Sequence, residues 1–326
     1  QMFFSLRPRL WAYLITGSLT AFLMLNGCGR HSTTGIFVDP AFGPLVSPDT
    51  QMLAGIRLDK IRDTPLYKKL NGRFDLQSRL DLFSQRTGLD PRKDLWQLLI
   101  ASEGKETVIM ARGRFTVGEL EPHLDALGKE RTPYKDYSLV GSPETSVVFL
   151  NPGVAVAGSQ NALRRLIDRR EGANGIPKQI ADRLAAMPAD DQLWMVDTAG
   201  VPSTGLLRDR SDVSSLLSNL VGYIKTTQIG VKLDDGVHLK AEVDCISPEG
   251  AQRVHDAIKG GIGLARLSTR NDQMDMLKLY DGVTVATTNT NVAITADAAG
   301  ELIDRFLTNL PNVRQQVHDR LDQLPK

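Results

Sequence analysis

Three short segments from the first half of this 326-residue chain recur in the second half, in the same order and at similar spacing. One such match could arise by chance, but three in order are difficult to obtain without a duplication. We therefore predict two tandem copies, at residues 47–186 and 187–326. The matched residues are 49–53 with 190–194 at an offset of 141, 114–127 with 245–258 at an offset of 131, and 147–159 with 285–297 at an offset of 138.

Residues suited to capping helices stand at matching places in the two predicted copies. Thr116 and Ser247 each precede a predicted helix, where a hydroxyl accepts hydrogen bonds from the first free N–H groups. Ser159 and Asp297 precede a second predicted helix, whose apolar residues have the spacing of one buried face. Each copy is predicted to run in the order strand, helical region, strand pair, helix, hairpin, helix.

The dipeptide Asp235-Gly236 predicts a type I′ turn, because these residues adopt positive φ angles readily. It joins predicted strands over 228–233 and 237–243, which must be antiparallel because two residues are too few for a crossover. Strand pairs followed by capped helices predict a largely antiparallel sheet with helices on one face. The predicted fold class is therefore α+β, built from two tandem copies of a strand, helix, hairpin and helix unit.

The N-terminal residues have the pattern of an export signal. Arg7 and Arg9 precede 18 uncharged residues, 10–27, and this run ends in Leu25-Asn26-Gly27-Cys28. The tetrapeptide resembles the lipobox of bacterial lipoprotein precursors, with a branched apolar residue at −3, a small residue at −1 and then cysteine. An uncleaved signal anchor is the alternative interpretation, because 18 uncharged residues can just span a bilayer.

The resemblance to lipoprotein precursors implies that residues 1–27 are a signal peptide and that Cys28 becomes the lipidated N-terminus. Because Gly29 follows the cysteine where Asp would favour the inner membrane, it also implies the outer membrane, facing the periplasm. Residues 28–46 carry Gly, Ser, Thr and Pro without regular periodicity. We predict that they form a flexible tether to the first copy.

The charge balance argues against a nucleic-acid partner. The chain has 39 basic and 38 acidic residues, and removal of residues 1–27 leaves 37 and 38, a net charge of −1. A chain with this balance has no long-range field that would attract nucleic acid. Its mature part also loosely resembles uncharacterised bacterial secreted proteins, a resemblance that implies no particular activity.

The sequence shows no pattern typical of a metal, cofactor or catalytic site. His238 and Glu242 point to the same face of a predicted strand, but their positions are about 13 Å apart, beyond hydrogen-bond reach. Cys245 is in phase with the inward-facing residues of that strand, which predicts a buried, unreactive thiol. Three further histidines lie in predicted helices without a histidine or cysteine at i+3 or i+4, so they form no helical metal pair: His123, His255 and His318.

The leading hypothesis is a lipid-anchored cell-envelope protein of the non-enzymatic binding or scaffolding type. It would be held to the membrane by its N-terminal lipid and would offer a sheet face, or the cleft between the copies, to an envelope protein or an apolar ligand. Two alternatives stay open. An envelope hydrolase could use a carboxylate pair such as Glu242 and Asp244, because such pairs leave no spacing signature. A carrier of an apolar ligand would need an apolar cavity between sheet and helices.

Overall fold

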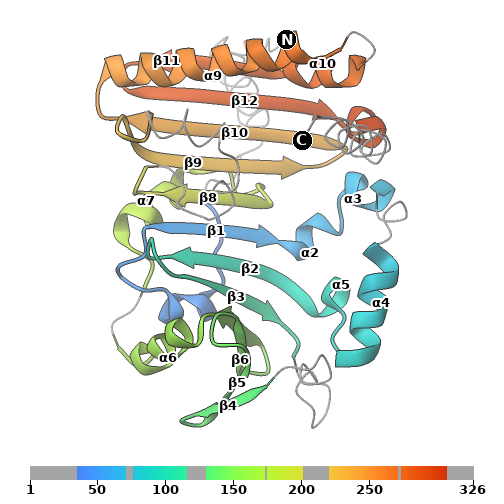
Figure 1. Ribbon diagram of the computed structural model, residues 1–326, viewed down its shortest axis with the longest axis vertical. Helices are drawn as coiled ribbons and strands as arrows, with labels where there is room; N and C mark the ends of the chain where they lie inside the picture. The colour runs from blue at the N-terminus through green and yellow to red at the C-terminus, as the bar shows by residue number, and fades with distance from the viewer. Residues whose placement is uncertain are drawn as a thin grey trace, which may run out of the picture.

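The computed structural model describes residues 35–70, 76–115, 130–172, 175–200, 220–270 and 273–306. Its strands form one 12-stranded sheet in the order β11-β12-β10-β9-β8-β1-β2-β3-β7-β6-β5-β4, and the paired strands are antiparallel (Figure 1). The predicted α+β class and largely antiparallel sheet are confirmed.

The elements are distributed along the whole described chain. The strands are β1 (Met52–Arg57), β2 (Leu95–Ser102), β3 (Thr107–Gly113), β4 (Arg131–Tyr134), β5 (Tyr137–Gly141), β6 (Ser146–Asn151), β7 (Val154–Gly158), β8 (Leu193–Asp197), β9 (Ile224–Leu233), β10 (Gly236–Cys245), β11 (Val283–Thr288) and β12 (Asn291–Ala299). The helices are η1 (Pro40–Leu45), α2 (Leu58–Ile61), α3 (Pro65–Leu70), α4 (Leu76–Thr87), α5 (Pro91–Asp94), α6 (Gln160–Arg169), α7 (Lys178–Ala186), α9 (Pro248–Ser268) and α10 (Met274–Asp281), and a further helix begins at residue 300.

The β1–β8 pair stands where the two halves of the sheet meet. Outward from it, the order is β1-β2-β3-β7-β6 on one side and β8-β9-β10-β12-β11 on the other, with the hairpin β4–β5 added beyond β6. Ala54 pairs directly with Met195, its equivalent at the offset of 141. Both features are compatible with a duplication, and the common origin of the halves stays a prediction.

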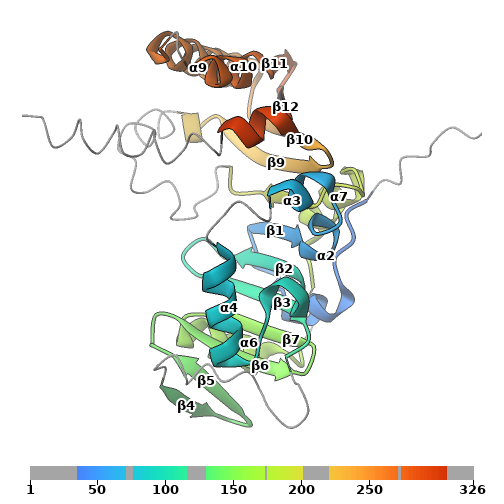
Figure 2. The same ribbon diagram turned by 90° about the vertical axis from the view of Figure 1, so that its right-hand side faces the viewer.

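The helices lie on both faces of the sheet, which differs from the single face expected. Residues paired across neighbouring strands share a face. Val196 therefore shares a face with Gln228 and Glu242, whereas Val243, next to Glu242, points the other way. Val196 packs in the cluster that includes α6 and α7, and Val243 packs in the cluster with α9. In Figure 2, α9 lies at the upper left of the strands and α7 to their right. We call these the α6 face and the α9 face.

The predicted tether is shorter than expected at its C-terminal end. Phe42, Leu45 and Val46 are buried in the α6-face cluster. The backbone N–H groups of Gly35 and Ile36 donate to carbonyl oxygens at the end of α7 and just after it, both at 2.8 Å. Three apolar side chains within five residues bury enough surface to fix a segment that lacks regular periodicity. Residues 35–46 therefore belong to the folded body.

The structure confirms two of the predicted helix caps and corrects a third. The hydroxyls of Ser159 and Ser247 each accept a hydrogen bond, at 3.1 Å, from the N–H three residues further on. Asp297 caps no helix, because β12 continues its pairing with β10 as far as Ala299 and the next helix begins at residue 300. The fourth cap, Thr116, lies outside the described residues.

The hairpin β9–β10 forms as predicted, but its turn is not of type I′. Neither Asp235 nor Gly236 has a positive φ angle. Instead, the Asp234 carboxylate accepts a hydrogen bond from the Gly236 N–H at 3.1 Å. A side chain of Asp can close a turn in this way without a left-handed backbone.

Several predicted residues lie outside the part of the chain that the structure describes. Residues 1–34 are among them, and the predictions for the signal peptide and for lipidation of Cys28 therefore stay predictions. The same holds for two of the histidines, His123 and His318.

The packing at the junction of the two halves can be tested by a glycine substitution. The Trp194 indole lies over Gly55 of the paired strand, and a Cβ added there would stand 2.3 Å from two indole carbons. We expect Gly55→Ala to cost about 1–3 kcal/mol of unfolding free energy through overpacking. Gly43→Ala is the control, because nothing lies within 4 Å of a Cβ at that position. Equal urea midpoints for the two variants would contradict the packing described.

Candidate binding surface

An apolar surface crosses the middle of the α9 face on five adjacent strands. None of its ten residues belongs to the three clusters of packed apolar side chains within the described chain, and all except the buried Ala241 are partly exposed. We call this surface the apolar stripe. Its two rows, paired across β2, β1, β8, β9 and β10, are Leu98, Ile56, Leu193, Val231 and Leu239, and then Ile100, Ala54, Met195, Ile229 and Ala241.

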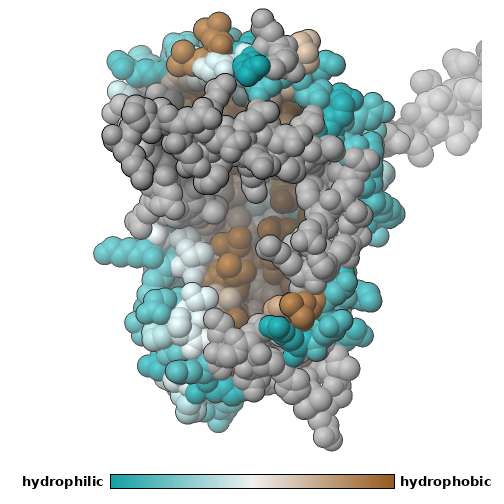
Figure 3. Space-filling view, turned by 45° about the vertical axis from the view of Figure 1, so that its right-hand side comes forward, coloured by the Kyte–Doolittle hydropathy of each residue, from teal (hydrophilic) through white to brown (hydrophobic). Residues whose placement is uncertain are grey.

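The strand spacing gives the size of the apolar stripe. Five strands about 4.8 Å apart span about 19 Å, and two same-face residues occupy about 7 Å along each strand. Figure 3 shows hydrophobic side chains gathered in a hollow at the middle of the molecule. A continuous apolar surface that lies outside the packed clusters is a candidate ligand or interaction site. The apolar stripe is therefore long and narrow.

A pair of polar residues borders the long side of the apolar stripe, near its middle. Asp197 and Thr227 pair across β8 and β9 directly beside the second row, and Asp197 is 1% exposed. Burial raises the pKa of Asp197, although hydrogen bonds from the N–H groups of Ala199 and Gly200 oppose this effect. The Thr227 hydroxyl donates to the Gly200 carbonyl at 2.7 Å. Oriented polar groups therefore lie along one long side of the stripe.

The carboxylates considered for hydrolysis lie on the α6 face of the second half. Glu242 accepts a hydrogen bond from Gln228 at 2.8 Å. Asp244 accepts one from Asn291 at 2.9 Å and forms an ion pair with Arg183. Burial would raise the pKa of Asp244, but these two contacts outweigh it and hold the pKa below its ordinary value. A carboxyl group with a lowered pKa is unsuited to act as a general acid.

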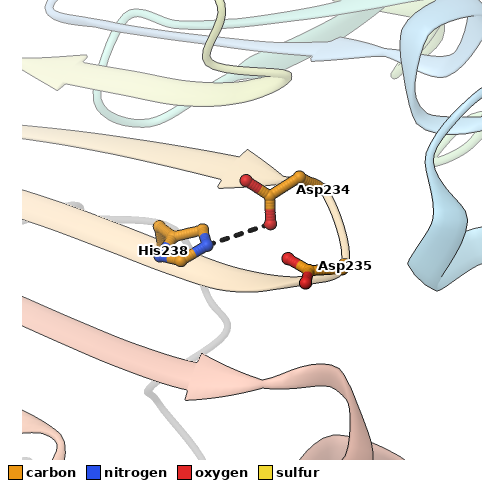
Figure 4. Close-up of side chains that lie close together, drawn as sticks. All are labelled: Asp234, Asp235 and His238. Carbon is orange, nitrogen blue, oxygen red and sulfur yellow. Dashed lines mark hydrogen bonds and ion pairs between the residues drawn. The ribbon is translucent and has the colours of Figure 1, made fainter.

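His238 joins the β9–β10 turn to β12. Its Nδ1 lies 2.7 Å from the Asp297 carboxylate and its Nε2 lies 2.9 Å from that of Asp234, the contact drawn in Figure 4. The hydrogen bond to Asp297 is the main reason that the pKa of His238 is raised, and Asp234 adds to it. Asp234, Asp235 and His238 also bring possible metal ligands within 4.8 Å of one another. Both ring nitrogens already have carboxylate partners, so the arrangement is explained by an ion-pair network.

Sequence reasoning missed these partners of His238. It considered Glu242, on the same strand, whereas Asp297 is 59 residues away along the chain. The pairing of β10 with β12 places Asp297 directly opposite His238. The spacing of residues within one strand does not reveal which residues of another strand lie opposite them.

Asp191 is a buried carboxylate beside β9. It is 8% exposed, and its Oδ2 has no hydrogen-bond partner. A Cβ added at Gly230 would lie 2.1 Å from that oxygen, so the glycine makes room for it. Burial, aided by the charge of Asp190, raises the pKa of Asp191 to about 6.

This raised pKa generates a prediction of pH dependence. The folded state holds the Asp191 proton more tightly than the unfolded state, whose Asp pKa is about 3.9. The contribution of Asp191 to the free energy of unfolding is therefore fully present below about pH 4. It is lost as the pH rises through 6, by about 2–3 kcal/mol in all. Asp191→Asn should flatten that part of the pH profile in urea unfolding.

The control for Asp191→Asn is Asp182→Asn, which removes an exposed carboxylate paired with Lys178 on α7. An exposed pair contributes at most about 1 kcal/mol. The pH profile of this variant should therefore follow the wild type. If Asp191→Asn and the wild type lost stability in parallel between pH 4 and 7, the raised pKa would be contradicted.

Cys245 is buried and free, as the sequence predicted. Burial raises the pKa of its thiol, with a further contribution from the charge of Asp244. A thiol with a raised pKa is a poor nucleophile. His255, on α9, lies within hydrogen-bond distance of the neighbouring Asp256, at 2.8 Å.

Comparisons with known proteins find no family and no curated protein that matches the chain. Solved structures of TP0453 are similar to it at low sequence identity. Crystal form III has a TM-score of 0.46 at 10% identity and covers 82% of this chain and 96% of its own. Crystal forms I and IV each have a TM-score of 0.44, at 9% and 11% identity, covering 84% and 83% of this chain and 98% and 97% of theirs. Among the described residues, no helix is long and apolar enough to cross a membrane.

Proposed function

We propose that this protein is a lipid-anchored cell-envelope protein that binds one aliphatic chain of a lipid along its apolar stripe, without catalysing a reaction. The observation that carries the proposal is the stripe itself. Its ten residues are all aliphatic or Met, and they form two unbroken rows over five strands. A surface without charges or aromatic rings favours saturated or unsaturated hydrocarbon over a sugar, nucleotide or peptide.

The dimensions of the stripe support an acyl chain as the ligand. The stripe spans about 19 Å. An acyl chain of one leaflet spans about 15 Å, half of the hydrocarbon thickness of a bilayer. The polar residues Asp197 and Thr227 lie along the long side of the stripe, where they could hydrogen-bond to a polar group of the ligand near the middle of the stripe.

The anchor in this proposal is Cys28. The lipobox-like sequence Leu25-Asn26-Gly27-Cys28 supports it, and the acyl chains on the cysteine would hold the protein at the outer membrane, facing the periplasm. Gly35, seven residues later, is already hydrogen-bonded to the folded body. Anchor and body are thus directly connected.

Probe binding tests the ligand class. We expect a fluorescent fatty acid to bind the full mature chain saturably, and Met195→Asp to weaken binding by about tenfold or more, because a carboxylate would then be buried against hydrocarbon. Ala54→Phe should also weaken it by filling the middle of the stripe without adding a charge. Thr284→Asp, which adds the same charge to an exposed residue of β11 on the α6 face, is the matched control.

Two results would contradict binding at the stripe. One is a wild type that shows no saturable binding of the probe. The other is unchanged affinity in both Met195→Asp and Ala54→Phe, provided that their urea midpoints show folded protein.

Metabolic labelling tests the anchor. In bacteria given an alkyne fatty acid, we expect the wild type to carry label and Cys28→Ala to lose both the label and the removal of residues 1–27. Cys245→Ala is the control, because it removes the other of the two cysteines and should keep the label. Equal label on Cys28→Ala and wild type would show that Cys28 is not the attachment site.

A further inference from the structure

Two exposed aromatic side chains stand beside one row of paired residues on the α6 face, near the first residues that the structure describes. Phe37 is 57% exposed and Trp96 is 41% exposed. They are the aromatic members of the set of exposed large hydrophobic residues in the described chain. Each ring has a guanidinium group over it, Arg57 at 5.9 Å from the Phe37 centroid and Arg112 at 5.7 Å from that of Trp96.

These groups form one continuous patch. Arg57, Gln97 and Arg112 are paired in a row across β1, β2 and β3. The segment that begins at Gly35 crosses this row: the Phe37 carbonyl accepts a hydrogen bond from Gln97 at 3.5 Å, and Asp39 forms an ion pair with Arg112 at 3.3 Å. We call Phe37, Trp96, Arg57 and Arg112 the aromatic patch.

The proposed anchor is close to this patch. Residues 29–34 separate Cys28 from Gly35. Seven Cα–Cα steps of at most about 3.6 Å place Gly35 within about 25 Å of the lipidated cysteine. A body of this length has a radius of gyration of about 19 Å and a diameter of about twice that or more. The short connection therefore keeps the surface around Gly35 facing the membrane.

We infer that the aromatic patch rests on the lipid headgroups of the membrane that carries the anchor. This inference rests on the lipidation of Cys28 in the proposed function. Tryptophan, whose ring is apolar and whose N–H is polar, prefers the interface between headgroups and hydrocarbon. The arginines already have Asp partners, Asp59 for Arg57 and Asp39 for Arg112, so the patch adds little net charge and its contact is mainly aromatic. The body is held to the membrane at two points.

Tryptophan quenching tests this contact on the acylated, full mature chain in vesicles that contain lipids brominated near the headgroup. The mature chain has two tryptophans, Trp96 and the 3%-exposed Trp194, so each can be observed alone in Trp194→Phe and Trp96→Phe. We expect Trp96 to lose emission and shift to the blue, and Trp194 to change little. Phe37→Ser should reduce the quenching of Trp96.

Mass spectrometry of the same sample separates the two proposals. Trp96 left unquenched in acylated, vesicle-bound protein would overturn the contact alone, and would point to a protein partner for the patch. Deeper quenching of Trp194 than of Trp96 would overturn it too, because a different surface would then face the lipid. An unacylated Cys28 would overturn the anchor and the inference with it.

Discussion

The antiparallel pairing of β1 with β8 is the contact on which the rest of the structure depends. It joins two sheets that would otherwise each end in an unpaired strand, and an exposed edge of this kind invites aggregation. The close approach of Trp194 to Gly55 fits one register, in which Ala54 lies opposite Met195. A slip by one residue would exchange the faces of every side chain in the strand. The register thus fixes which residues of both halves share a face.

The apolar stripe is a consequence of that register. One buried cluster lies on the α6 face around Leu163 and includes residues of both halves, and another lies on the α9 face around Val254. The stripe belongs to none of the three clusters. It consists of the same-face residues of strands at the junction and next to it. Neither half alone contains it, because the rows run from β2 across β1 and β8 to β10. The candidate binding surface exists only when the halves are joined.

Local sequence patterns predicted the local structure well. A hydroxyl before an amphipathic segment identified the caps at Ser159 and Ser247, and alternation along β10 identified the burial of Cys245. These features depend on residues within a few positions of one another. Asp297 was misplaced because its strand extends by pairing with β10, a contact that no local pattern records.

The binding surface could not be predicted for the same reason. The sequence showed that Leu239 and Ala241 alternate with polar residues along β10. This alternation is the same whether or not a helix covers the apolar face of the strand. Only the cross-strand register shows that their neighbours are Val231 and Ile229, and only the helix positions show that this part of the sheet lies outside the packed clusters. Phe42 shows the opposite error. Its segment has no periodicity and was expected to be flexible, but a few large buried side chains fix it in place.

The two proposed surfaces lie on opposite faces of one sheet. Arg57 and Gln97 of the row beneath the aromatic patch pair on the α6 face, whereas Ile56 and Leu98, next to them in sequence, pair on the α9 face within the apolar stripe. Contact of the aromatic patch with the membrane would therefore turn the stripe away from that membrane and toward the periplasm. A stripe in this orientation would receive its acyl chain from the aqueous side, where an exposed hydrocarbon chain gains most from being covered. The alternation of side chains along β1 and β2 thus separates anchoring from ligand binding.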